Sequence, residues 1–349
     1  MNTKIIKIDP ESFRDEELFY AAEAIREGKL VAFPTETVYG LGANALNGEA
    51  CDRIFEAKGR PHDNPLIVHI AKPEDAFLYA ECPEPELFQS VVSHFMPGPI
   101  TVILPKKSVI PDSVTVGLQT VALRCPSHPV AHRLIELAGV PIAAPSANLS
   151  GKPSPTTARH VIEDMSGRID CILDGKDAEV GVESTVISIH NGSVRLLRPG
   201  YVTAEMLKSA VGNVEVDPAV LSQLKEGVKP ESPGMKYRHY APSAPVSMVC
   251  GDEEKVIAFF RERLRDGDGI LCFDEDLPLF KEEPHSQLLR SFGSRFDLSS
   301  QAHRLFDALR YFDQTSVRHI YARETQKNDL GLAVTNRLLR ACAFERIDL

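Results

Sequence analysis

Helix-like and strand-like patterns alternate along the first part of the chain. An amphipathic pattern at residues 17–27 is followed by apolar, β-branched runs at 30–33, 66–70 and 100–104. This alternation predicts an α/β sheet. Further strand candidates lie at residues 121–124, 140–144, 169–173, 185–189 and 194–197. We therefore predict one large, twisted mixed-sheet domain at residues 1–213.

A change of pattern separates this domain from the rest of the chain. Residues 216–245 contain five prolines and little apolar periodicity, which is typical of a linker. The alternation then resumes, with candidate elements at residues 246–250, 253–265, 269–273, 300–312, 317–322 and 330–344. The predicted fold is α/β: the large domain, a Pro-rich linker at residues 214–245, and a smaller Rossmann-like domain at residues 246–349.

Length and composition agree with two domains. The chain has 349 residues, of which 43% are hydrophobic and 25% charged, and this length exceeds what one core usually supports. No uncharged apolar run approaches the roughly 20 residues that cross a bilayer, and the start has no signal-peptide core. The seven cysteines are scattered without a CxxC pair, which favours reduced thiols over structural zinc. We expect a cytoplasmic protein with no membrane contact.

The charge of the chain bears on its partners. The formal net charge is −10, which repels a nucleic-acid backbone unless a local basic patch compensates. The charge therefore favours an enzyme acting on small molecules over an RNA-binding module.

The common nucleotide-binding and hydrolase motifs are missing from the sequence. Gly40 and Gly42 follow a predicted strand, but position 45, where a dinucleotide fingerprint has its third glycine, is alanine. No GxxxxGK(S/T) phosphate loop, HExxH metal helix or GxSxG elbow occurs. The sequence thus excludes P-loop kinases, zincins and the common serine hydrolases.

Three polar segments follow predicted elements. Thr35 comes after the strand at 30–33, where the carboxyl ends of α/β strands bind ligands. Lys58 and Arg60 come at the end of a helix near residues 50–57, and the turn-forming segment 143–151 follows another strand. Taken alone, the two cations are typical of a helix C-terminus, and the Ser and Asn of segment 143–151 are typical of a turn.

Together these segments resemble the YrdC-like family of threonylcarbamoyl-AMP synthases. The sequence Pro-Gly-Met-Lys-Tyr-Arg-His-Tyr-Ala-Pro at residues 233–242 extends the resemblance to the family's long, two-domain branch. The resemblance implies a YrdC-like catalytic domain that makes L-threonylcarbamoyladenylate from L-threonine, bicarbonate and ATP, with release of pyrophosphate and water. The product would serve a separate threonylcarbamoyl-transferase complex that modifies tRNA beside the anticodon, with no direct tRNA requirement.

The implied chemistry assigns roles to particular residues. The carbamate nucleophile is already an anion, so no strong base is needed, and Lys58 and Arg60 would act catalytically by spreading phosphate charge. Mg²⁺ would be held mainly by the nucleotide, with no metal ligand from protein side chains. The resemblance places around threonine Thr35, His69, Arg124, Ala144 and Ser184. It places around the nucleotide Arg60, Asn64, Thr120, Ser146, Asn148, Ser154, Arg198 and Tyr237.

Simpler interpretations of these residues stay open. Without the resemblance, His69 is more typical of a core histidine, and Arg198 of a surface arginine beside a turn. Two other functions are alternatives: a double-stranded RNA-binding module and a carbamoyl-transfer maturation factor for metal centres. The aromatic and basic residues 236–240 in the linker are not needed for a plain spacer. We expect this linker to close over the active site as a lid.

Overall fold

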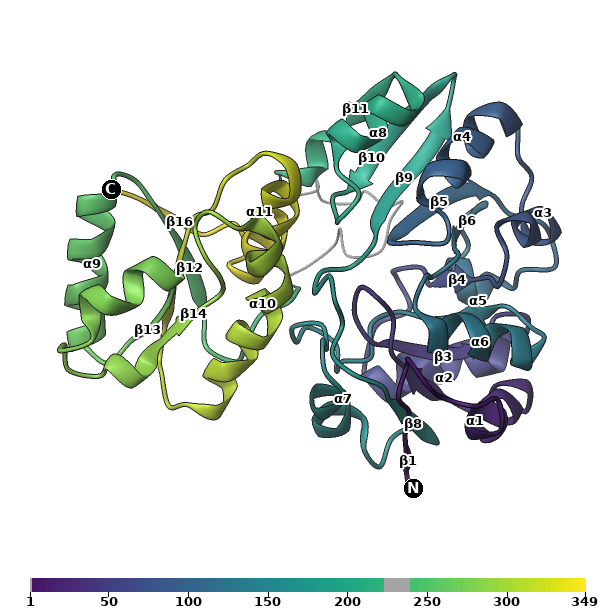
Figure 1. Ribbon diagram of the computed structural model, residues 1–349, viewed down its shortest axis with the longest axis horizontal. Coiled ribbons are helices and arrows are strands. Elements are labelled where there is room, and N and C mark those ends of the chain that lie inside the picture. Colours follow the sequence, from purple (N-terminus) through teal and green to yellow (C-terminus); the bar gives the residue numbers. More distant parts are fainter. Residues whose placement is uncertain (1, 223–238) are drawn as a thin grey trace.

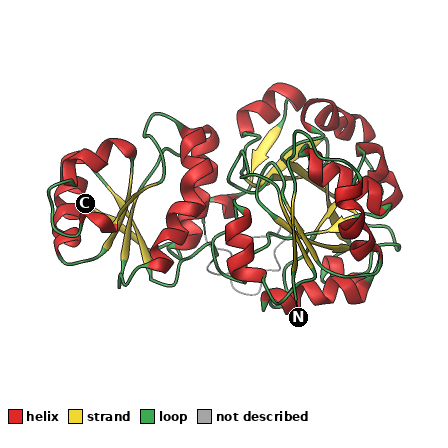
Figure 2. Ribbon diagram, turned by 60° about the horizontal axis from the view of Figure 1, so that its bottom comes forward, coloured by secondary structure: helices red, strands yellow, loops and turns green. Residues whose placement is uncertain are grey.

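The computed structural model describes residues 2–222 and 239–349 and contains two α/β domains. The N-terminus lies in the larger domain and the C-terminus in the smaller one (Figure 1). Helices flank the strands in both domains (Figure 2). None of the helices in the described ranges is both long and apolar enough to span a bilayer.

The larger domain contains one 11-stranded sheet. Its strands are β1 (Lys4–Lys7), β2 (Val31–Phe33), β3 (Gly40–Asn44), β4 (Ile67–His69), β5 (Ile100–Pro105), β6 (Thr120–Arg124), β7 (Ile142–Ala143), β8 (Cys171–Asp174), β9 (Thr185–His190), β10 (Ser193–Arg198) and β11 (Val214–Val216). Their order is β1-β8-β2-β3-β7-β4-β6-β5-β9-β10-β11. Strand β6 pairs parallel with β4 and antiparallel with β5, so the sheet is mixed, as predicted. Strand β11 lies within the range predicted as linker.

Helices pack around this sheet, and one of them ends directly before residues of the predicted site. The helices are α1 (Glu16–Arg26), α2 (Gly48–Lys58), α3 (Ala76–Tyr79), α4 (Pro85–Phe95), α5 (Asp112–Thr115), α6 (Pro129–Ala138), α7 (Ala158–Met165) and α8 (Ala204–Val211), with the 3-10 turns η1 (Pro73–Asp75) and η2 (Pro218–Val220). The Asn47 side chain caps the start of α2, and Gly59 ends it in the left-handed conformation with a φ of 60°. The chain therefore leaves the helix directly after Lys58, and Arg60 enters the next loop.

The smaller domain is a doubly wound α/β unit. Its strands are β12 (Val246–Cys250), β13 (Gly269–Cys272), β14 (Leu289–Ser291), β15 (Ile320–Arg323) and β16 (Arg346–Asp348). The helices are α9 (Glu253–Arg265), α10 (Leu298–Tyr311) and α11 (Asp329–Ala341), with the 3-10 turns η3 (Asp274–Phe280), η4 (Ser286–Leu288) and η5 (Phe312–Gln314). All strand pairs are parallel, in the order β14-β13-β15-β12-β16. Helices α10 and α11 lie on the side of the larger domain and α9 on the far side (Figure 1), which confirms the Rossmann-like prediction.

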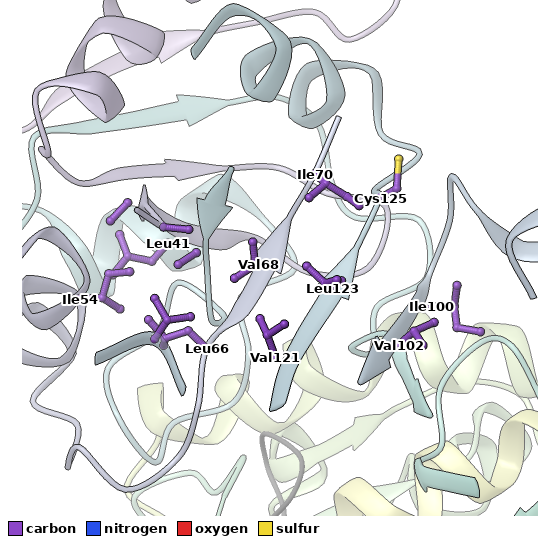
Figure 3. Packing of buried hydrophobic residues seen from close by; sticks show 14 of the residues in the cluster. Leu41, Ile54, Leu66, Val68, Ile70, Ile100, Val102, Val121, Leu123 and Cys125 are labelled. Carbon is purple, nitrogen blue, oxygen red and sulfur yellow. The ribbon is translucent and has the colours of Figure 1, made fainter. Parts of the chain in front are cut away.

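Alternation along the central strands separates the core from the functional face. Val68 of β4 and Leu123 of β6 are register partners and point into the main apolar core, as Figure 3 shows. Because successive side chains of a strand point to opposite faces, their neighbours His69 and Arg124 lie on the other face. The hydrophobic core thus fixes which side of the sheet carries the polar residues.

Candidate active site

A pocket lies over this polar face. Parallel register places His69 of β4 opposite Arg124 of β6, and both line the pocket. The carboxyl ends of the strands do not meet at one edge. Strand β7 pairs antiparallel with both β3 and β4, so β2 and β7 end at one edge while β4 ends at the other. The pocket therefore extends across the face of the sheet.

Residues from all three predicted segments line this pocket. Of the predicted site residues, the lining contains Thr35, Arg60, Asn64, His69, Arg124, Ala144, Ser146, Ser184 and Arg198. It also contains Val38, Tyr39, Gly40, Pro65, Ile67, Pro145, Glu183, His239 and Tyr240, which the site prediction did not include. Residues more than 160 positions apart thus share one cavity, through the pairing of β4, β6, β7, β9 and β10 in one sheet.

Of the predicted site residues that the structure describes, four lie outside the lining. Thr120 is at the start of β6, paired with Pro105. The Ser154 hydroxyl donates to the carboxylate of Glu183 from behind the pocket wall. The amide nitrogen of Asn148 donates to carbonyl oxygens of its own loop. Lys58 also contacts this loop, as described next.

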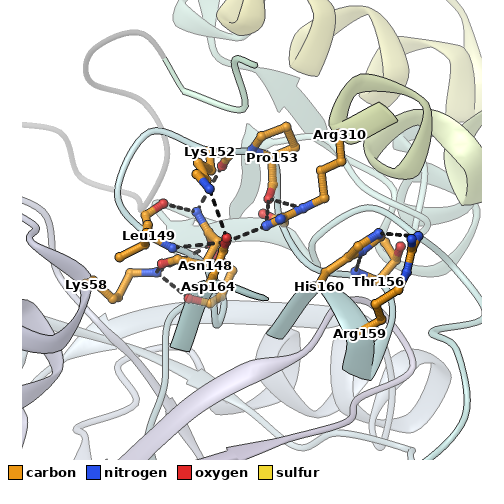
Figure 4. A network of polar contacts seen from close by, with 12 residues as sticks. Lys58, Asn148, Leu149, Lys152, Pro153, Thr156, Arg159, His160, Asp164 and Arg310 are labelled. Carbon is orange, nitrogen blue, oxygen red and sulfur yellow. Dashed lines mark hydrogen bonds and ion pairs between the residues drawn. The ribbon is translucent and has the colours of Figure 1, made fainter. Parts of the chain in front are cut away.

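Lys58 binds the loop that carries Ser146 and Asn148. Its ammonium group donates to the carbonyl oxygens of both residues, at 2.6 Å for Asn148 (Figure 4). The side chain is 3% exposed, and burial, followed by the neighbouring Arg60 charge, lowers its pKa well below the usual value. Lys58 therefore holds the shape of the loop from behind, whereas Arg60 lies in the lining.

The predicted threonine side of the pocket has a buried arginine beside a neutral histidine. An Arg124 Nη donates to Glu36 Oε1 at 2.7 Å, and this charge lowers the pKa of the Glu36 carboxyl although burial alone would raise it. Burial and the Arg124 charge lower the pKa of His69 to about 3. Among the described residues, the buried Arg124 Nε has no hydrogen-bond partner. The pocket thus offers a fixed positive charge with a donor available to an anion.

A second arginine of the lining joins two strands. Arg198, at the end of β10, donates to the carbonyl oxygen of Ser184 at 3.1 Å and 3.0 Å and to its hydroxyl at 3.1 Å. The same hydroxyl lies 2.7 Å from the Thr101 hydroxyl. Arg198 thereby fixes the Ser184 side chain at the start of β9.

His69 gives a prediction on acid stability. Its pKa falls from 6.5 to about 3 on folding, so between these values only the unfolded chain takes up the proton. Stability is therefore complete above pH 6.5 and falls as the pH approaches 3, by up to about 1.4 kcal/mol per pH unit. The His69→Gln variant should lose less stability than the wild type between pH 7 and pH 4 in denaturant melts. The His132→Gln variant serves as the control. An equal loss of stability in the wild type and in His69→Gln would contradict the prediction.

The predicted lid is only partly described. Residues 223–238, including Tyr237, lie outside the described residues. The next two, His239 and Tyr240, line the pocket, and the Tyr240 ring packs 5.2 Å from Phe306 of α10. The end of the linker thus joins the pocket to the smaller domain, and closure of the linker stays a prediction.

The described residues contain no group of three or more His, Cys, Asp or Glu that could hold a metal ion. The two carboxylates of the pocket region, Glu36 and Glu183, are each paired with an arginine.

The fold and the pocket define a two-domain α/β protein whose pocket is lined by arginine and hydroxyl side chains. Residues 23–200 match a family model described as "Telomere recombination", and residues 202–343 match "Threonylcarbamoyl-AMP synthase, C-terminal domain". The chain belongs to the threonylcarbamoyl-AMP synthase family, in its two-domain form. The family resemblance seen in the sequence is therefore confirmed.

Three relatives document this membership. The threonylcarbamoyl-AMP synthase of Pyrococcus abyssi is 47% identical over 94% of each chain, and that of Bacillus subtilis is 46% identical over 95% of each. The crystal structure of Pyrococcus abyssi Sua5 complexed with L-threonine is similar with a TM-score of 0.90 and 45% identity, over 99% of this chain and all of that one. The similarity thus extends over both domains.

Proposed function

We propose that the chain is a nucleotidyltransferase that makes threonylcarbamoyl-AMP from L-threonine, bicarbonate and ATP, and releases pyrophosphate and water. The observation that carries the proposal is a pocket with buried Arg124 on one side and Arg60 and Arg198 among the other lining residues. Such a pocket suits the joining of two anions, a carbamate and a nucleoside triphosphate. The names of the full-length relatives support the same activity.

Threonine would bind on the Arg124 side. The free Nε of Arg124 and its planar guanidinium suit the threonine carboxylate. Neutral His69 adds no second positive charge there, and the small side chain of Ala144 leaves room for the substrate. The Thr35 and Ser184 hydroxyls line the same pocket and suit the hydroxyl of threonine.

The reaction would proceed by alignment and charge stabilisation. Bicarbonate carboxylates the threonine amine, and a carbamate oxygen then attacks the α-phosphorus of ATP while the bond to pyrophosphate breaks. The nucleophile is an anion, so no strong base is required, and Glu36 and Glu183 are already paired with arginines. Arg60 and Arg198 would stabilise charge on the phosphates, with Lys58 acting through the loop of Ser146 and Asn148.

The other residues proposed to contact the nucleotide differ in their position relative to the pocket. Asn64 and Ser146 line the pocket, and a buried Asn64 oxygen has no partner among the described residues. Ser154 and Thr120 would contribute from outside the lining, and Tyr237 from the linker. Mg²⁺ would arrive with ATP and remain on its phosphates, where it would neutralise charge.

The biological role is part of the proposal. The adenylate would pass to a separate threonylcarbamoyl-transferase complex that modifies tRNA beside the anticodon. We place the enzyme in the cytoplasm, since all seven cysteines are free, which suits a reducing compartment.

A pyrophosphate-release assay tests this function. Purified protein with Mg-ATP should release pyrophosphate only when both L-threonine and bicarbonate are present, because the carbamate is the nucleophile. Addition of tRNA should not be required. Undiminished release without threonine would contradict the proposal.

A further inference from the structure

Two buried arginines of the smaller domain reach the rear of the active site. Arg310 lies on α10 and is 6% exposed, and Arg337 lies on α11 and is 0% exposed. Both helices lie on the side of the larger domain (Figure 1). Their guanidinium groups bind two different segments of the pocket wall.

Arg337 connects the two segments that carry Ser184 and Arg198. Its Nε donates to Glu183 Oε2 at 2.9 Å, and its Nη1 donates to the Pro199 carbonyl oxygen at 2.6 Å. Glu183 directly precedes Ser184, and Pro199 directly follows Arg198. One side chain from the smaller domain thus fixes both partners of the Ser184–Arg198 contact inside the pocket.

Arg310 holds the neighbouring 146–154 loop in the same way, and the Ser154 hydroxyl of this loop donates to Glu183. Its guanidinium donates to the Pro153 carbonyl oxygen at 3.1 Å and 2.6 Å and to Asp164 Oδ2 at 2.7 Å. Asp164 also accepts from the Leu149 backbone and from Lys152 (Figure 4). These contacts tie down the far half of the loop whose near half Lys58 holds.

The cost of burying these arginines indicates a role beyond adhesion between domains. Desolvation of a buried ion pair cancels much of its attraction, and apolar side chains of similar volume often stabilise an interface as well. A buried network whose hydrogen bonds are all made instead fixes the geometry of the groups that it connects. Here the geometry being fixed is that of Glu183–Ser184, which line the pocket, and of the 146–154 loop, whose Ser146 lines it.

We propose that the smaller domain preorganises the active site through Arg337 and Arg310, which act as positioning residues for the Glu183–Ser184 segment and for the loop that carries Ser146. The inference rests on the proposed function for its assay. It assigns the smaller domain a part in the reaction that does not require a ligand of its own.

The ion pair between Arg337 and Glu183 allows this role to be tested through the pH dependence of the activity. Charged or titratable groups face Glu183 from several elements, namely Arg337, Arg198, Tyr240, His239 and Lys58. Burial raises the pKa of Glu183, whereas Arg337 and then Arg198 lower it. Loss of Arg337 removes one of the charges that lower the pKa of Glu183, so burial raises this pKa. The Glu183 carboxyl then takes up a proton as the pH falls.

The test uses full-length Arg337→Gln, Arg310→Gln and the control Arg265→Gln, which removes an exposed arginine on α9. We expect each of the first two to lower kcat/KM about 10-fold to 100-fold, as misplaced catalytic groups do, at a temperature where all variants are folded. The ratio of Arg337→Gln to wild-type activity should fall from pH 8 to pH 6. Arg337→Lys should abolish that pH dependence while keeping part of the rate loss, since lysine restores the charge but not the forked contacts.

A double-mutant cycle with Glu183→Gln completes the test. The combined variant should be no slower than the slower single variant, because both changes break one contact. Additive rate losses, or wild-type kcat/KM with only a lowered melting temperature, would overturn the inference. If the wild-type chain itself releases no pyrophosphate, it is the proposed function that fails, so the two failures are distinguishable.

Discussion

Replacement of Arg124 by glutamine is expected to raise the KM for threonine by about 30-fold to 5000-fold. Loss of one partner of a buried charged contact costs about 2 to 5 kcal/mol, and the guanidinium is the proposed partner of the substrate carboxylate. Its buried Nε has no hydrogen-bond partner among the described residues. The KM for ATP should change far less. Steady-state pyrophosphate release with each substrate varied in turn measures both constants.

The same variant needs a control for stability. Arg124→Gln leaves Glu36 without its 2.7 Å ion pair in a buried place, which costs about 3 to 5 kcal/mol when the carboxylate stays charged. The double variant Arg124→Gln with Glu36→Gln removes that charge and should recover stability but not threonine affinity. Arg168→Gln, at an exposed arginine after α7, should leave both unchanged. Equal KM values for threonine in all variants would remove Arg124 from the substrate site.

The Lys58→Met variant should lower turnover by about 100-fold, in the range found for lost electrostatic contacts, and should lower the melting temperature as well. Both effects follow from one geometry, since the ammonium group binds the carbonyl oxygens of Ser146 and Asn148. Buried acceptors that lose their donor cost about 1 to 3 kcal/mol each. Thermal melting and kinetics of the same preparation measure both.

Two further variants separate the structural role of Lys58 from the role of its charge. Arg60→Ala removes a residue of the lining and should lower turnover with less effect on melting than Lys58→Met. Lys29→Met, at an exposed lysine, serves as the control. Unchanged turnover in Lys58→Met would refute its contribution to the site. A lower turnover with an unchanged melting temperature would assign Lys58 to charge alone.

The elements that the sequence predicted are those with strong local patterns. The apolar runs that became β5, β6 and β9 and the helix that became α9 are confirmed nearly to the residue. Strand β3 was not predicted because its sequence, Gly-Leu-Gly-Ala-Asn, lacks β-branched residues. Its place depends on tertiary contact: a Cβ at Gly42 would lie 2.7 Å from Ile142 and 2.8 Å from Phe33.

Some site residues can likewise be recognised from their local sequence, whereas others depend on tertiary contacts. Thr35, Arg60 and Ser146 stand in recognisable segments and lie in the pocket. The position of Lys58 behind its loop depends on how that loop turns. The helix containing Arg337 was predicted, yet nothing in its sequence indicates that this side chain crosses to the other domain. Such a role arises only when the domains dock.

Mass spectrometry of the product tests the central claim most directly. Protein, Mg-ATP, L-threonine and ¹³C-labelled bicarbonate should give an AMP adduct that contains threonine and is one mass unit heavier than the adduct made with unlabelled bicarbonate. No adduct should form when threonine or bicarbonate is omitted, and tRNA should be unnecessary. An AMP adduct of threonine without the labelled carbon, or no threonine-dependent adduct at all, would contradict the assignment of the chain as a threonylcarbamoyl-AMP synthase.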